Sequence, residues 1–128
     1  MGARQMAEIW KAANEVYEAA GGAGDEPSAL CTVEAVTASG DEVWVQLMPG
    51  TVNLSYPFTD EPTALLRARG VRLPEDAYLV EWVAGQHATF GFGHIGARDH
   101  AFLADQLFVR VLGCDDESYE PRPSVESL

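Results

Sequence analysis

The chain of 128 residues has little positive charge, few cysteines and no long apolar stretch. Eight Lys and Arg against twenty Asp and Glu give a net charge of −12, so it lacks the basic patch that binds phosphate backbones or anionic membranes. No stretch reaches the length of a membrane span, and residues 1–17 contain no apolar run of signal-peptide type. We therefore expect a cytoplasmic protein with no nucleic-acid or membrane partner. Its acidity either favours basic partners or only keeps the chain soluble.

The scarce chemical groups form no recognisable catalytic or metal-binding set. Cys31 and Cys114 lie far apart in sequence and outside any Cys-x-x-Cys pair, so two reduced thiols are expected, although the sequence cannot place their Cα atoms. His87, His94 and His100 lack the spacing and the cysteine companions that zinc sites usually show. No serine has a Gly-x-Ser-x-Gly context. The sequence thus predicts no catalytic residues, no metal, no cofactor and no enzyme activity.

Apolar periodicity predicts an α+β domain with a five-stranded antiparallel sheet, in the element order α-β-β-β-α-β-β-α. The expected helices cover residues 6–20, about 60–69 and about 98–112, and the expected strands cover 30–37, 43–48, 51–58, 78–83 and 87–92. Residues 1–113 form the expected domain. Residues 114–128 are acidic and interrupted by prolines, which is typical of a flexible tail.

The segment Gly91–Gly96 matches the glycine pattern of dinucleotide-binding loops, between an expected strand and an expected helix. That fingerprint works inside a strand–helix–strand unit of a parallel sheet. Here the preceding strand belongs to an antiparallel hairpin, so the glycines are better explained as the exit from a strand into a helix. Binding of a nucleotide or another small ligand remains an alternative.

The strands carry large apolar side chains on both sides of the expected sheet. If helices cover the side with Val45, Leu54, Val80 and Phe90, the opposite side exposes four large apolar residues. These are Trp44, Met48, Leu79 and Val83. Each such side chain left in water forgoes roughly 1.5–3 kcal/mol of burial, so the four predict a dimer or partner surface. The competing interpretation is that the last helix covers this side and completes an ordinary core.

The element order resembles that of the type III secretion chaperone-like superfamily, which includes the class I secretion chaperones and the YbjN-like proteins. The resemblance covers about residues 6–113, and includes the segment 53–57 that runs into the helix opened by Asp60-Glu61-Pro62. It implies an acidic homodimer that holds an extended or partly folded segment of a partner protein, with no catalytic residues or cofactor. The Gly21–Gly24 loop and the C-terminal tail depart from it.

We therefore expect a chaperone-like protein-binding module. The first alternative is an acidic immunity-type protein that neutralises a basic toxin, and the second is the ligand binder already described. Salt dependence of binding separates the chaperone-like module from the immunity-type protein, because exposed charge pairs are screened by salt and apolar contacts are not.

Overall fold

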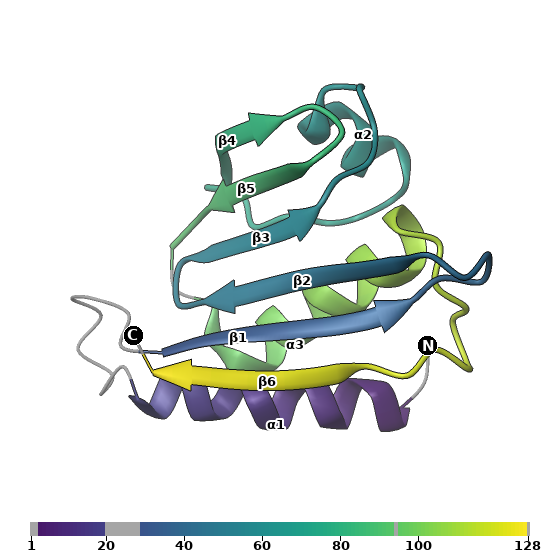
Figure 1. The fold of residues 1–128 in the computed structure, drawn as a ribbon. Helices are drawn as coiled ribbons and strands as arrows, with labels where there is room; N and C mark the ends of the chain where they lie inside the picture. The colour runs from purple at the N-terminus through teal and green to yellow at the C-terminus, as the bar shows by residue number, and fades with distance from the viewer. Residues whose placement is uncertain (1–2, 20–28, 94, 128) are drawn as a thin grey trace.

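The computed structural model describes residues 3–19, 29–93 and 95–127 and has the α+β architecture shown in Figure 1. Its elements are α1 (Ala3–Ala19), β1 (Ala29–Val36), β2 (Glu42–Met48), β3 (Thr51–Ser55), α2 (Pro62–Ala68), β4 (Tyr78–Val83), β5 (His87–Gly91), α3 (Gly96–Gln106), the π-helical segment η1 (Leu107–Val111) and β6 (Arg122–Ser127). The strands form one antiparallel sheet in the order β4-β5-β3-β2-β1-β6. The predicted class is confirmed, but the sheet has six strands instead of five.

The core lies between the sheet and a layer formed by α1 and α3, which pack side by side. The stripe of α1 that carries Ile9, Ala13 and Val16 is buried, as a 3.6-residue repeat requires of a helix on a sheet. Inward residues of the central strands belong to the same core as this stripe and α3; among them Val45, Leu54 and Phe90 are 0–1% exposed. The prediction that these three face the helices is confirmed.

The face assignment of β4 was wrong for its first residues. Leu79 pairs with Phe90 and packs against the core, whereas Val80, predicted to face the helices, is 53% exposed. The reason is an irregular register between Leu79 and Glu81, where an extra residue interrupts the alternation of the strand. Beyond this bulge, Trp82 pairs with Ala88 and faces the core.

The C-terminal segment is part of the fold, contrary to the prediction of a flexible tail from residue 114. Strand β6 pairs antiparallel with β1, so that Ser124 lies opposite Thr32. Buried Tyr119 anchors the preceding turn, since its hydroxyl donates to the carboxylate of Asp105 at 2.5 Å and its ring lies against Phe108. These are contacts between residues far apart in sequence, which the acidic composition of the segment does not reveal.

Two contacts from α1 hold the same turn in place. The Nε2 group of buried Gln5 donates to the carbonyls of Glu117 and Tyr119, at 2.8 and 3.2 Å. Arg4 pairs with Glu120 through two hydrogen bonds of 2.9 and 3.0 Å. Helix α1 therefore contributes to the position of β6 at the edge of the sheet.

Candidate protein-binding face

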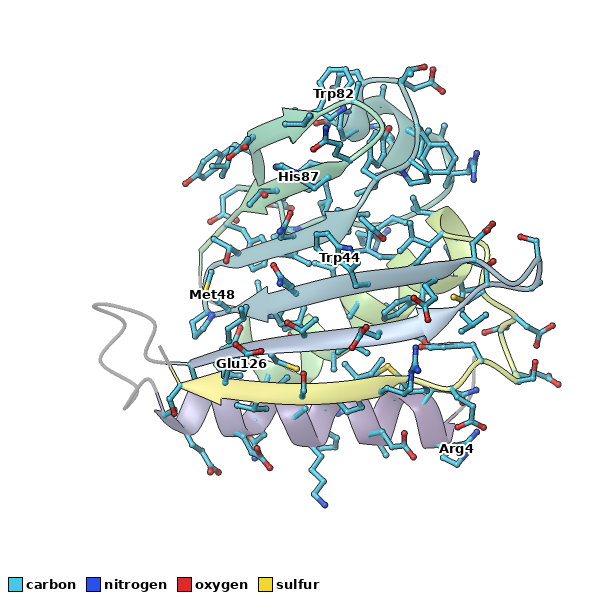
Figure 2. The ribbon with its side chains drawn as sticks, in the orientation of Figure 1. Arg4, Trp44, Met48, Trp82, His87 and Glu126 are labelled. Atoms are coloured by element: carbon cyan, nitrogen blue, oxygen red, sulfur yellow. The ribbon has the colours of Figure 1, made fainter. Side chains whose placement is uncertain are left out.

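One face of the sheet is free of any other element in the part of the chain that the structure describes. In Figure 1 the sheet is seen from this side, with α3 behind it. Figure 2 shows Trp44 and His87 on this side. We call the face opposite α1 and α3 the open face.

A row of polar residues crosses the middle of the open face from one edge of the sheet to the other. The strand register places one residue from each strand in this row: Ser124, Thr32, Gln46, Asn53, Thr89 and Glu81. Three side-chain hydrogen bonds connect neighbours: Thr89 Oγ1 to Asn53 Oδ1 at 2.9 Å, Asn53 Nδ2 to Gln46 Oε1 at 3.0 Å, and Gln46 Nε2 to Thr32 Oγ1 at 3.4 Å. These residues already satisfy part of their hydrogen-bonding capacity with one another. A partner that covers the row therefore leaves fewer polar groups unpaired than it would on a row without these hydrogen bonds.

Apolar side chains lie on both sides of this polar row. Trp44 and Val83 belong to the adjoining row on one side, and Leu30, Met48 and Tyr78 to the adjoining row on the other. Trp44, Met48 and Val83 are half-buried in the free chain, and Tyr78 is 63% exposed. Three of the four predicted surface residues therefore share the open face, and Leu79 does not.

The three predicted residues are not in mutual contact. Met48 is four positions after Trp44 along β2, which corresponds to about 13 Å. Trp44 and Val83 lie on strands three positions apart in the sheet, a separation of roughly 14 Å. The apolar surface is thus divided by the polar row into two strips.

Tyr78 was not singled out by the sequence, although its position has a recognisable cause. A Cβ atom added at Gly91 would lie 2.7 Å from Cζ of Tyr78, so the ring crosses the backbone of β5 where a side chain is missing. A glycine inside a strand often marks such a close approach. The glycine within the expected strand was visible in the sequence, but the sequence did not show that Tyr78 lies opposite it.

The charges of the open face are predominantly negative. Its register positions carry the carboxylates of Glu34, Glu42, Glu81 and Glu126, against the guanidinium of Arg122. His87 Nε2 lies 3.1 Å from Glu81 Oε1 at the β4–β5 end. The face therefore favours positively charged groups that approach it.

The strongly perturbed titratable groups are in the interior. Burial lowers the pKa of His100 to about 4, and burial raises the pKa of Asp105 above its usual value. Both thiols are free and buried, and burial raises the pKa of Cys31 and Cys114 to about 11. These groups are buried and do not lie on the open face.

The other residues singled out by their chemistry are dispersed. His87 is at the surface and His100 in the core, while His94 lies outside the described residues. No group of three His, Cys, Asp or Glu that could hold a metal ion is found in residues 3–19, 29–93 and 95–127. Every strand pairing in this part of the chain is antiparallel, so Gly91–Gly96 does not sit in the parallel unit that a dinucleotide loop needs.

Comparison with family models, with curated proteins and with solved structures finds no match to this chain. Within the described residues, none of the helices has the length and apolar character needed to cross a bilayer.

Proposed function

We propose that this protein is a non-enzymatic binding module whose open face holds a basic, extended segment of a partner protein. The observation that carries the proposal is a face of a six-stranded sheet that no element of the described residues covers, with apolar strips on both sides of a hydrogen-bonded polar row. Alternating apolar and basic side chains of an extended segment suit such a surface, because a strand presents every second residue to the same side.

The charge of the face selects the kind of occupant. Four carboxylates against one guanidinium complement Lys and Arg in a partner segment. A second copy would bring the same four carboxylates, and a further charge of −12, against this face. We therefore assign the open face to a partner of different sequence, and a homodimer through it is an outcome that the experiment must test.

The test uses a fluorescein-labelled peptide of the repeat Lys-Val-Lys-Leu, twelve residues long, and fluorescence polarisation. Trp44→Glu should weaken its binding at least tenfold, since it places a charge in an apolar strip of the site. Trp10→Glu is the matched control, because it makes the same change at a Trp that is 45% exposed on α1, away from the sheet. Equal loss in both variants, or no binding by the unmodified protein, would overturn the proposal.

Folding and assembly are checked in the same samples. Circular dichroism of Trp44→Glu should be unchanged; if this variant unfolds, Trp44→Thr keeps a strand-forming residue and replaces it in the test. Light scattering coupled to size exclusion reports the oligomeric state, and a dimer lost in Trp44→Glu alone would assign the open face to a second copy.

The acidic face also suits the immunity-type alternative, in which a folded basic toxin is neutralised. In that case binding would require the folded partner and would disappear in about 0.5 M salt, where the screening length falls to a few ångströms. Binding of the extended peptide that persists in that salt and depends on Trp44 supports the proposed module.

A further inference from the structure

The helical side of the molecule carries a groove built from three adjoining hollows. The first, of about 420 Å³, lies beside the end of α2, and the second, of about 650 Å³, lies between the following loop and α3. Both are lined by the loop residues 72–75. The third, of about 610 Å³, lies between α1 and α3 and shares Asp99 and Phe102 with the second. Because neighbouring hollows share wall residues, the three follow one another from α2 across α3 to the N-terminal half of α1, and together they are called the groove.

Two exposed aromatic side chains line this groove. Trp10 is 45% exposed and Phe102 is 39% exposed, although both are among the largest apolar residues of the chain. Met6, Leu73 and Ile95 add half-buried apolar surface to the walls. Exposed aromatic residues in a concave surface are the usual anchors of protein recognition.

The groove also collects the positive charge that is scarce elsewhere. Arg67, Arg72 and Arg98 line it, against the carboxylates of Glu75 and Asp99. In the part of the chain that the structure describes, none of these three arginines lies within 4.0 Å of a carboxylate oxygen. Arg98 instead lies over the ring of Trp10, at 5.8 Å from its centroid.

Two further arginines stand behind one end of the groove. Arg110 Nη1 donates to the carbonyl of Gly70, which lines the first hollow, and Arg69 Nη1 donates to the carbonyl of Arg110. Five of the eight basic residues of the chain thus lie in or beside this groove. Its local charge is opposite to that of the open face.

We propose that this groove binds a short acidic segment of a partner protein, one that places aromatic or leucine side chains against Trp10 and Phe102 and carboxylates against the arginines. A guanidinium pairs with a carboxylate through two parallel hydrogen bonds, which suits arginines that have no carboxylate partner among the described residues. A small inorganic anion would use one arginine and leave the aromatic positions empty, and the net charge of −12 repels long polyanions such as nucleic acid. The module then has two recognition surfaces of opposite charge on its two sides.

The probe is a fluorescein-labelled peptide of the repeat Glu-Phe-Asp-Leu, twelve residues long, in about 0.1 M salt. Arg72→Glu and Arg98→Glu should each weaken its binding at least tenfold. Arg122→Glu is the matched control, because it makes the same change of net charge, from −12 to −14, on the open face. It should change binding less than twofold. Phe102→Gln should weaken binding without any change in charge.

Several results would overturn this inference. One such result is that the acidic peptide does not bind. Another is that the three Arg→Glu variants weaken its binding equally, which would show general repulsion by the added negative charge. Displacement by 10 mM inorganic phosphate with no effect of Phe102→Gln would show a small-anion site. A dimer that Phe102→Gln dissociates would show that a second copy occupies the groove.

The inference and the proposed function fail separately. Trp44→Glu should leave the acidic peptide bound, and Arg98→Glu should leave the basic peptide bound, since the two residues lie on opposite sides of the molecule.

Discussion

Acidification should destabilise the fold through one buried side chain, His100. It is 0% exposed, its Nδ1 lies 2.8 Å from the hydroxyl of Tyr17, and its ring forms a T-shaped pair with that of Phe92 at a centroid distance of 5.3 Å. Burial lowers the pKa of His100 from 6.5 to about 4, and the backbone of Thr51 opposes this shift, although Nε2 makes no hydrogen bond of good geometry. The folded state therefore keeps the imidazole neutral where the unfolded chain binds a proton.

The sign and the size follow from these two pKa values. Between pH 6.5 and about 4 the unfolded state binds more protons, so the free energy of unfolding falls as the pH falls through this window. The difference is 6.5 − 4 = 2.5 pKa units, and each unit corresponds to about 1.4 kcal/mol, so the full loss is about 3.5 kcal/mol. That is a large part of the total stability of a small domain.

Urea denaturation, followed by Trp fluorescence from pH 7.5 to pH 4.5, measures this loss. His100→Gln cannot titrate, so it should lose about 2–3 kcal/mol less than the unmodified protein over that range. The raised pKa of Asp105 acts in the opposite direction, but both proteins share it and it cancels in the comparison. Equal losses in the two proteins, or an NMR titration of the His100 ring with a midpoint near 6.5, would refute the reasoning.

Three further predictions concern the C-terminal segment and the thiols. Tyr119→Phe leaves the carboxyl of Asp105, which is 1% exposed, without its donor, and should lower the free energy of unfolding in urea by about 1–3 kcal/mol. Deletion of residues 121–128 removes β6 and exposes the edge of β1; the melting temperature should fall, and size exclusion should detect association through the exposed edge. Cys31 and Cys114 are buried with pKa values near 11, so Ellman's reagent should modify them only as fast as the protein unfolds, and immediate reaction of either thiol would contradict their placement.

Local patterns predicted the parts of the sheet whose alternation is uninterrupted. The faces of Val45 and Leu54 follow from their own strands, because apolar and polar residues alternate there without a break. The bulge at Val80 could not be read in this way. It depends on the pairing of β4 with β5, whose register shifts between Leu79 and Glu81.

The sixth strand, β6, could not be predicted from the composition of its segment. Its sequence is acidic and contains Pro123, so composition favours a mobile segment. What holds it is nonlocal: the hydroxyl of Tyr119 on Asp105, the amide of Gln5 on two carbonyls, and the edge of β1. Each group is separated from its partner by fourteen or more positions in the chain, and a single sequence does not reveal such pairings.

The polar row of the open face depends partly on a local pattern that the sequence shows and partly on strand pairing that it does not show. Gln46 and Asn53 are recognisable in the sequence as the polar side of their strands, but their hydrogen bond requires the register that places them opposite each other. The sequence thus predicted a side of the sheet, whereas the division of that side into two apolar strips needed the structure.

Net charge gave an incomplete guide to the partners, because charge acts over short distances at physiological salt. The screening length is about 8 Å, whereas the open face and the groove are separated by the sheet and a helical layer, and helices pack about 10 Å from their neighbours. A ligand at either surface therefore responds mainly to the charges beside it. The total of −12 is consistent with the carboxylates around Trp44, but it conceals the arginines in and beside the groove, five of the eight basic residues of the chain. For this molecule the chemistry of a partner has to be inferred surface by surface, and the two surfaces favour opposite charges.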